Sequence, residues 1–153
     1  MFPSLLLFLI AGGLGAVPPL LHHQRGLIVA KASLRMIYKD FVKEWSEPSN
    51  ARWNLQIALN RNLNRVKDVI EPLARIGDDP TGIGNRFNIL KRVANEILRL
   101  VFTSPFQEAS LQRVATAGNS LMELCKQKLD VIQARQRRAL ERVPFWFYHL
   151  SFT

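Results

Sequence analysis

The chain is poor in the residues from which compact catalytic and metal sites are built. Its 153 residues include one cysteine, Cys125, and three histidines, His22, His23 and His149. A single cysteine excludes an internal disulfide and a cluster of thiolate ligands. The side chains of His22 and His23 would point about 100° apart on a helix, so one of them could face a haem or pigment. We nevertheless expect no cofactor, no metal and no enzymatic activity.

Charge is absent from the beginning of the sequence. No Asp, Glu, Lys or Arg precedes Arg25, and residues 1–24 fall within the range of about 17–25 residues that a membrane-spanning helix needs. Pro18 and Pro19 lack an amide hydrogen and should kink or end such a helix. The segment therefore predicts a short, kinked transmembrane anchor. A signal peptide and a buried soluble helix are the alternatives.

The same segment indicates how the anchor would pack and which way it would face. Its AGGLGA sequence has small residues four positions apart, which lets helices approach closely in a bilayer. The predicted packing residues are Ala11, Gly12, Gly15 and Ala16. Cations follow the anchor and none precedes it, so the positive-inside rule places the carboxyl side in the cytoplasm or mitochondrial matrix. We expect an integral protein of a mitochondrial or bacterial inner membrane.

Acidic residues are outnumbered by basic ones. There are 12 Asp and Glu against 21 Lys and Arg, which gives a formal net charge of +9. An anionic partner is therefore expected, either lipid headgroups, nucleic acid or an acidic protein surface. Charge alone does not choose among these three.

Residues 25–46 have the pattern of a basic amphipathic helix. Apolar residues recur every three or four positions, and Lys31, Arg35, Lys39 and Lys43 form a row at i,i+4 spacing. Two interpretations stay open. The helix could lie on a lipid surface with its cations among phosphates, or it could be a bundle helix whose basic face is solvated.

Residues 50–142 predict an antiparallel helical bundle. Two apolar seams have near-heptad spacing; they are Leu55, Leu59, Leu63, Val66, Ile70 and Leu73, and Ile83, Phe87, Leu90, Ala94, Ile97 and Val101. Pro72 should kink or end the first helix near Glu71. Ser104 is expected to cap the last helix, with Gln107 completing a capping box. Gly118 interrupts the last apolar stripe, which indicates either a neighbouring backbone or a break, and we favour one long helix.

The carboxyl end is basic and then aromatic. Trp and Tyr favour membrane interfaces, and Arg beside them can meet phosphate. The predicted interfacial or partner anchors are Phe145, Trp146, Phe147 and Tyr148. The predicted contacts with lipid headgroups or an acidic partner are Arg25, Lys31, Arg35, Lys39, Lys43, Arg135, Arg137, Arg138 and Arg142. No RRM, KH or zinc-knuckle pattern accompanies them, which argues against RNA.

Together these patterns predict an all-α protein with four regions: a membrane anchor (1–24), a basic juxtamembrane helix (25–46), a helical bundle (50–142) and an aromatic tail (143–153). The expected function is that of a non-catalytic accessory or assembly subunit of a larger membrane complex, in contact with other subunits and anionic phospholipid. The alternative is a soluble basic helical adaptor that binds nucleic acid or a ribosome. No known family is suggested by the residues.

Overall fold

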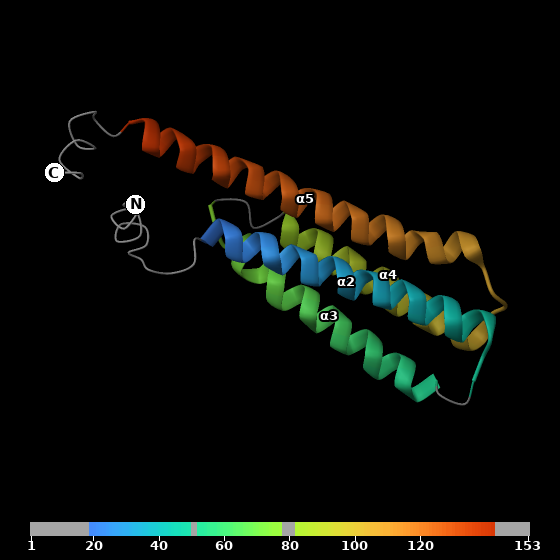
Figure 1. Cartoon of the computed structure of the whole chain (residues 1–153). Helices are drawn as coiled ribbons and strands as arrows, with labels where there is room; N and C mark the ends of the chain where they lie inside the picture. Colours follow the sequence, from blue (N-terminus) through green and yellow to red (C-terminus); the bar gives the residue numbers. More distant parts are fainter. Residues whose placement is uncertain (1–18, 50–51, 78–81, 143–153) are drawn as a thin grey trace. The chain divides into compact units, whose positions relative to one another are not determined.

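A computed structural model describes residues 19–49, 52–77 and 82–142. These residues form four α-helices and no strand, which confirms the all-α class. The helices are α2 (Pro19–Ser46), α3 (Arg52–Ala74), α4 (Ile83–Thr103) and α5 (Glu108–Glu141) (Figure 1). The chain divides into two compact units, Gly26–Lys126 and a second unit made from the two ends of the chain. Of the second unit the structure describes residues 19–25 and 127–142.

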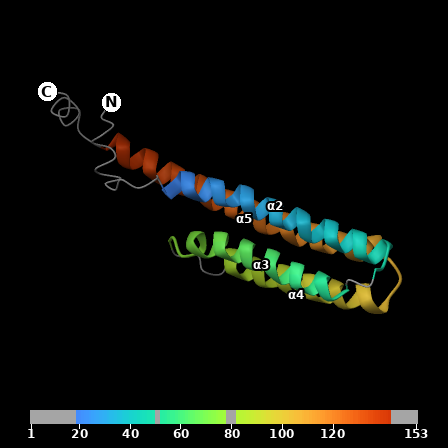
Figure 2. The same ribbon diagram turned by 60° about the horizontal axis from the view of Figure 1, so that its bottom comes forward.

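The unit Gly26–Lys126 is an antiparallel four-helix bundle. Successive helices run in opposite directions, and α3 packs along α4 while α2 lies beside α5 (Figure 2). Contacts between helices join Gly26 to Val69, Tyr38 to Gln112 and Glu96 to Arg113. The expected helical bundle is confirmed. However, residues 26–46, which the sequence separated from it, supply one of its four helices.

The predicted apolar seams form the core of this bundle. All six seam residues of α3 and all six of α4 are buried. The apolar stripe of α2 joins them, because Ala30, Ile37, Phe41 and Trp45 are also buried. A bundle helix with its basic face turned outward is therefore the interpretation that describes α2, and its apolar stripe is not available to a lipid surface.

The expected membrane anchor falls mostly outside the described residues. Ala11, Gly12, Gly15 and Ala16 lie within residues 1–18, which the structure does not describe. Residues 19–24 form the start of α2, which begins at Pro19. Proline suits the first position of a helix, where its missing amide hydrogen removes no intrahelical bond. Within residues 19–49, 52–77 and 82–142, no helix combines the length and apolar character that crossing a membrane requires.

Helix α3 does not end near Glu71, which was one of the two expectations for Pro72. The helix continues through Pro72 to Ala74, two residues beyond the proline. The Arg75 amide still donates to the Glu71 carbonyl at 3.2 Å. Gly77 follows with φ of 76°, a left-handed conformation that glycine adopts without a Cβ clash and that favours chain reversal after a helix. Gly77 therefore helps to direct the chain away from α3.

The expected capping box at Ser104 and Gln107 is wrong. Ser104 ends α4, with its amide donating to the Leu100 carbonyl at 2.8 Å, and α5 begins at Glu108. The Ser104 carbonyl has another role, because it accepts a hydrogen bond from the Trp45 indole Nε1 at 2.9 Å. The Trp45 ring also meets Phe106 edge to face, with centroids 5.5 Å apart. Through these two contacts, Trp45 packs the end of α2 against the connection between α4 and α5.

Helix α5 is continuous over 34 residues, which confirms one long helix instead of two. Gly118 does mark a close approach, although the neighbour is a side chain and not a backbone. A Cβ at Gly118 would lie 3.4 Å from Leu34 Cδ1. The missing side chain therefore makes room for Leu34 of α2 against α5.

Trp45→Phe should lower the free energy of unfolding by about 0.5–1.5 kcal/mol, because the indole hydrogen bond to Ser104 is lost. Trp45→Ala should lower it by about 3–5 kcal/mol, because it also removes a buried ring. Urea unfolding followed by circular dichroism measures both changes. Trp53→Phe is the matched control, since Trp53 is 72% exposed and its replacement should change stability little. Equal effects at the two tryptophans would contradict the assigned contact.

Candidate anion-binding groove

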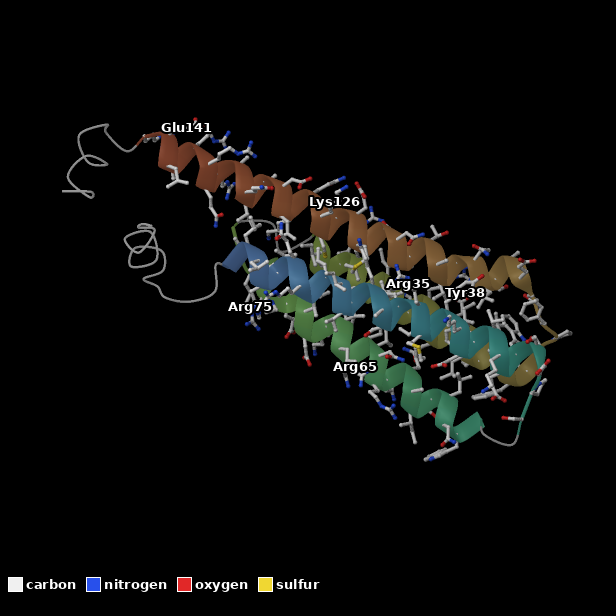
Figure 3. All side chains as sticks on the ribbon, viewed as in Figure 1. Arg35, Tyr38, Arg65, Arg75, Lys126 and Glu141 are labelled. Atoms are coloured by element: carbon white, nitrogen blue, oxygen red, sulfur yellow. The ribbon has the colours of Figure 1, made fainter. Side chains whose placement is uncertain are left out.

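A groove of about 500 Å³ lies between α2 and α5 within the four-helix bundle. Its volume falls within the range of about 300–1,000 Å³ that is usual for small-molecule sites. Five lining residues come from α2 and five from α5: Lys31, Leu34, Arg35, Tyr38 and Lys39, and Val114, Ala115, Gly118, Asn119 and Met122. Figure 3 shows Arg35 and Tyr38 between these two helices. We call this site the α2/α5 groove.

The floor of the α2/α5 groove is apolar. Val114 and Met122 are buried, and Leu34 is half-buried. Leu34 packs against Gly118, and both residues line the groove. Ala115 adds a second small side chain at the edge. The α5 side of the groove is therefore lined in part by two small residues, Gly118 and Ala115.

The rim on the α2 side is strongly basic. Lys31, Arg35 and Lys39 are exposed and lie one helical turn apart, a spacing at which neighbouring side chains interact. None of the described lining residues is acidic, and among the described residues none of the three cations forms an ion pair. Like charges at i,i+4 destabilise a helix by about 0.2–0.5 kcal/mol per pair. An anion held between them would relieve this repulsion.

Polar groups complete the α2/α5 groove. The Tyr38 hydroxyl oxygen accepts a hydrogen bond from Gln112 Nε2 at 3.1 Å, so its own hydrogen stays available for donation. Asn119 contributes an amide from α5. Cations that attract an anion and neutral donors that orient it are thus combined above an apolar floor. Such an arrangement suits binding of an anion that carries an apolar group.

The acidic residues Asp40 of α2 and Glu96 of α4 both lie outside the lining of the α2/α5 groove. Burial raises the pKa of the Asp40 carboxyl, while the charges of Lys43 and Arg61 act in the opposite direction. The Glu96 carboxylate accepts two hydrogen bonds from Arg113, at 2.9 and 3.1 Å, and the pKa of Glu96 is lowered as a result. Neither carboxylate lines the α2/α5 groove. The positive charge of its rim is therefore not neutralised by them.

Comparison with family models, curated proteins and solved structures finds no match to this chain. The candidate site thus rests on the geometry of its own residues. Of the predicted contact cations, Lys31, Arg35 and Lys39 are brought together in the groove. Arg25 and Lys43 are exposed but do not line it.

The remaining predicted site residues lie at the ends of the chain. Arg135, Arg137, Arg138 and Arg142 are all exposed, and they belong to the second compact unit. The aromatic residues Phe145, Trp146, Phe147 and Tyr148 are outside the described residues. Their roles stay predictions.

The sequence missed the α5 side of the groove. Ala115, Asn119 and Met122 of α5 were not expected to take part in a site, and neither was Tyr38 of α2. Gly118 was the one available signal, since it interrupts an apolar stripe. Which helix approaches it could not be read from the pattern, because that depends on how the helices are arranged around the core.

The cysteine and histidine residues add no second site to the described residues. The Cys125 side chain is fully buried, with 0% exposed, so its thiol is closed to a substrate in solution. His22 is exposed while His23 is buried, and their rings meet edge to face with centroids 5.8 Å apart. Within the described parts of the chain, no three His, Cys, Asp or Glu side chains gather as a metal site would require.

Arg35→Gln should stabilise the bundle by about 0.2–1 kcal/mol at low salt, because Arg35 is repelled by both Lys31 and Lys39. Arg113→Gln is the matched control and should destabilise the protein, since Arg113 is bound to Glu96. Thermal unfolding at low and high salt measures the stability of both variants. Added salt should reduce the stabilisation caused by Arg35→Gln, because it screens the repulsion between the cations. A loss of stability in Arg35→Gln would contradict the assignment of an unpaired basic rim.

The loss of folding stability caused by Arg113→Gln should also depend on pH. Because the folded protein holds the pKa of Glu96 below its unfolded value, the ion pair stabilises the protein above the unfolded pKa. This contribution disappears as the pH falls through the folded pKa. The stability difference between Arg113→Gln and the parent chain should therefore vanish in acid.

Proposed function

We propose that the protein is a non-catalytic accessory or assembly subunit of a membrane complex, placed at an acidic membrane surface by helix α2. The observation that carries this proposal is the composition of the outer face of α2. Large apolar side chains on α2 are unusually exposed, and the most exposed of them are Ile28 by 69%, Val29 by 50% and Met36 by 47%. Arg35, Lys39 and Lys43 are also exposed and follow one another at i,i+4 spacing, with Met36 between the first two of them.

This outer face suits the interface of an anionic bilayer. Apolar side chains can enter the boundary between headgroups and acyl chains, while Lys and Arg remain at the level of the phosphates. The apolar residues concerned are distinct from the buried stripe of α2, so the helix can present them without leaving the bundle. Surface binding therefore requires no unfolding of the core.

The charges on α2 alone would give only reversible binding. Each cation near an anionic surface contributes about 1 kcal/mol, and stable attachment of a surface-bound protein generally needs a second signal. The apolar residues 1–24 are our proposed second signal, as a short transmembrane anchor. Ala11, Gly12, Gly15 and Ala16 would pack there against other subunits.

The carboxyl end would add further contacts. In this proposal Arg135, Arg137, Arg138 and Arg142 meet phosphate or an acidic subunit, and the aromatic residues 145–148 act as an interfacial anchor. By the positive-inside rule, the cations that follow the proposed anchor would favour the cytoplasmic or matrix side of an inner membrane for the bundle. The partners are thus other subunits of the complex and anionic phospholipid.

A soluble adaptor that binds nucleic acid is the second candidate function. It is favoured by a second basic row on α4, where Lys91, Arg92 and Arg99 line a shallow hollow with Asn88 and Asn95. Phosphate contacts of this kind would not select a sequence. The α4 row lacks the exposed apolar residues of α2, which is why we prefer the membrane.

In alkaline carbonate extraction, the full chain should stay with the membrane pellet, because residues 1–24 hold it in the bilayer. A variant that lacks residues 1–18 should be released by carbonate yet bind acidic vesicles at neutral pH through α2. Purification of the full chain in a mild detergent should also recover the other subunits of its complex.

Release of the full chain by carbonate would contradict the proposed anchor. If the released protein also bound RNA with an affinity that falls steeply with salt, the adaptor function would replace the membrane function.

A further inference from the structure

We propose that the α2/α5 groove binds a single acidic phospholipid, with its phosphate between Lys31, Arg35 and Lys39 and the upper part of an acyl chain on the apolar floor. This inference deepens the proposed function, and it rests on that function for the source of the ligand. It assigns a defined binding site where the function requires only a charged surface.

The basic rim matches the charge of a lipid phosphate. Three cations on successive turns of one helix face an anion from the same side, and no acidic side chain among the described lining residues opposes them. Lysine and arginine both donate charge-assisted hydrogen bonds to phosphate oxygens. The Tyr38 hydroxyl hydrogen, which its bond from Gln112 leaves available, is a further donor at the same rim.

The floor distinguishes a lipid from a simple phosphate. Leu34 and Ala115 are partly exposed beside the cations, with the buried side chains of Val114 and Met122 completing the lining, and covering such apolar surface with an acyl chain is favourable. Inorganic phosphate would leave the exposed parts of Leu34 and Ala115 in contact with water. The juxtaposition of cations with an apolar channel therefore fits a ligand that carries both a charge and a hydrocarbon chain.

The position of the groove also favours a lipid over an acidic protein segment. Arg35 and Lys39 belong to both the groove and the outer face of α2, where Met36 is 47% exposed. A bilayer that contacts the outer face would bring its headgroups to the entrance of the groove. One surface therefore serves both for docking and for capture of a single lipid.

The α4 row provides a comparison within the same bundle. Its hollow is lined by Lys91, Arg92 and Arg99, an equal number of cations, but Leu98 is the one apolar residue among its described lining. The two sites thus have similar charge and different floors. Replacing either set of three cations by Gln changes the net charge of the protein equally.

The test uses the full chain in a neutral detergent, with bound lipid counted by native mass spectrometry. The probes are lysophosphatidylglycerol, which has a phosphate and one acyl chain, zwitterionic lysophosphatidylcholine, and glycerol phosphate, which lacks the chain. We expect one lysophosphatidylglycerol per protein and at least tenfold weaker binding of the other two. The triple variant Lys31→Gln, Arg35→Gln and Lys39→Gln should lose at least tenfold in affinity.

Two control comparisons distinguish loss of the groove from a general loss of positive charge and from misfolding. The triple variant Lys91→Gln, Arg92→Gln and Arg99→Gln should bind within about twofold of the parent chain. Ala115→Phe should block the groove without changing charge, whereas Ala117→Phe, on another side of α5, should not. Thermal unfolding of each variant verifies that the bundle is retained.

Equal losses in the two triple variants, or unchanged binding in Ala115→Phe with an intact fold, would overturn the groove assignment. Tight binding of glycerol phosphate would overturn the role of the floor. These outcomes are distinct from failure of the proposed function. A protein that carbonate releases but that binds lysophosphatidylglycerol in the groove would refute the membrane anchor and leave the lipid site standing.

Discussion

The burial of one stripe of α2 in the four-helix core fixes the orientation on which the rest of the structure depends. Ala30, Ile37 and Phe41 are almost completely buried, and a helix with these residues in a core cannot rotate without exposing them. Turning even one large side chain into water costs about 1.5–3 kcal/mol. The cations of α2 are consequently held outward, and Leu34 is held at the edge of the core against Gly118.

This constraint explains how a basic groove persists without acidic partners. Lys31, Arg35 and Lys39 repel one another, and their repulsion is small compared with the stability contributed by the buried stripe. The fold therefore supports a cluster of unpaired cations that a free helix would disfavour. Arg113, bound to Glu96 on the other side of α5, shows the common alternative of a surface cation with an acidic partner.

Helix formation and core membership were readable from the sequence, because they depend on local periodicity. The seams of α3 and α4 consist of apolar residues spaced by three or four, and every one of them is buried. The continuous α5 was also expected in spite of Gly118. For Lys31, Arg35 and Lys39, the regular spacing was enough to predict a shared face.

Features that depend on contacts between distant residues were not readable. The apolar stripe of α2 fits a lipid surface as well as a bundle, and only its packing with the other helices decides between them. Ser104 and Gln107 resemble a capping box, but Ser104 ends α4 and α5 begins only at Glu108. The contact that Ser104 does make, between its carbonyl and Trp45, joins residues 59 positions apart in the sequence. The α5 half of the groove was missed for the same reason. Ala115 and Met122 do not indicate a binding site by their residue types, and only the packing of α5 against Leu34 of α2 shows that they line one.

Amide hydrogen exchange along α2, in the absence of any lipid, tests most directly whether this helix belongs to the bundle core. If α2 is a bundle helix, the amides of Ala30, Ile37 and Phe41 should exchange only through global unfolding, at the same free energy as the core amides of α3 and α4. If these amides instead exchange nearly as fast as those of an unstructured peptide while α3 and α4 stay protected, then α2 is not part of the core. The groove and the outer face described here would then not exist in the unbound protein.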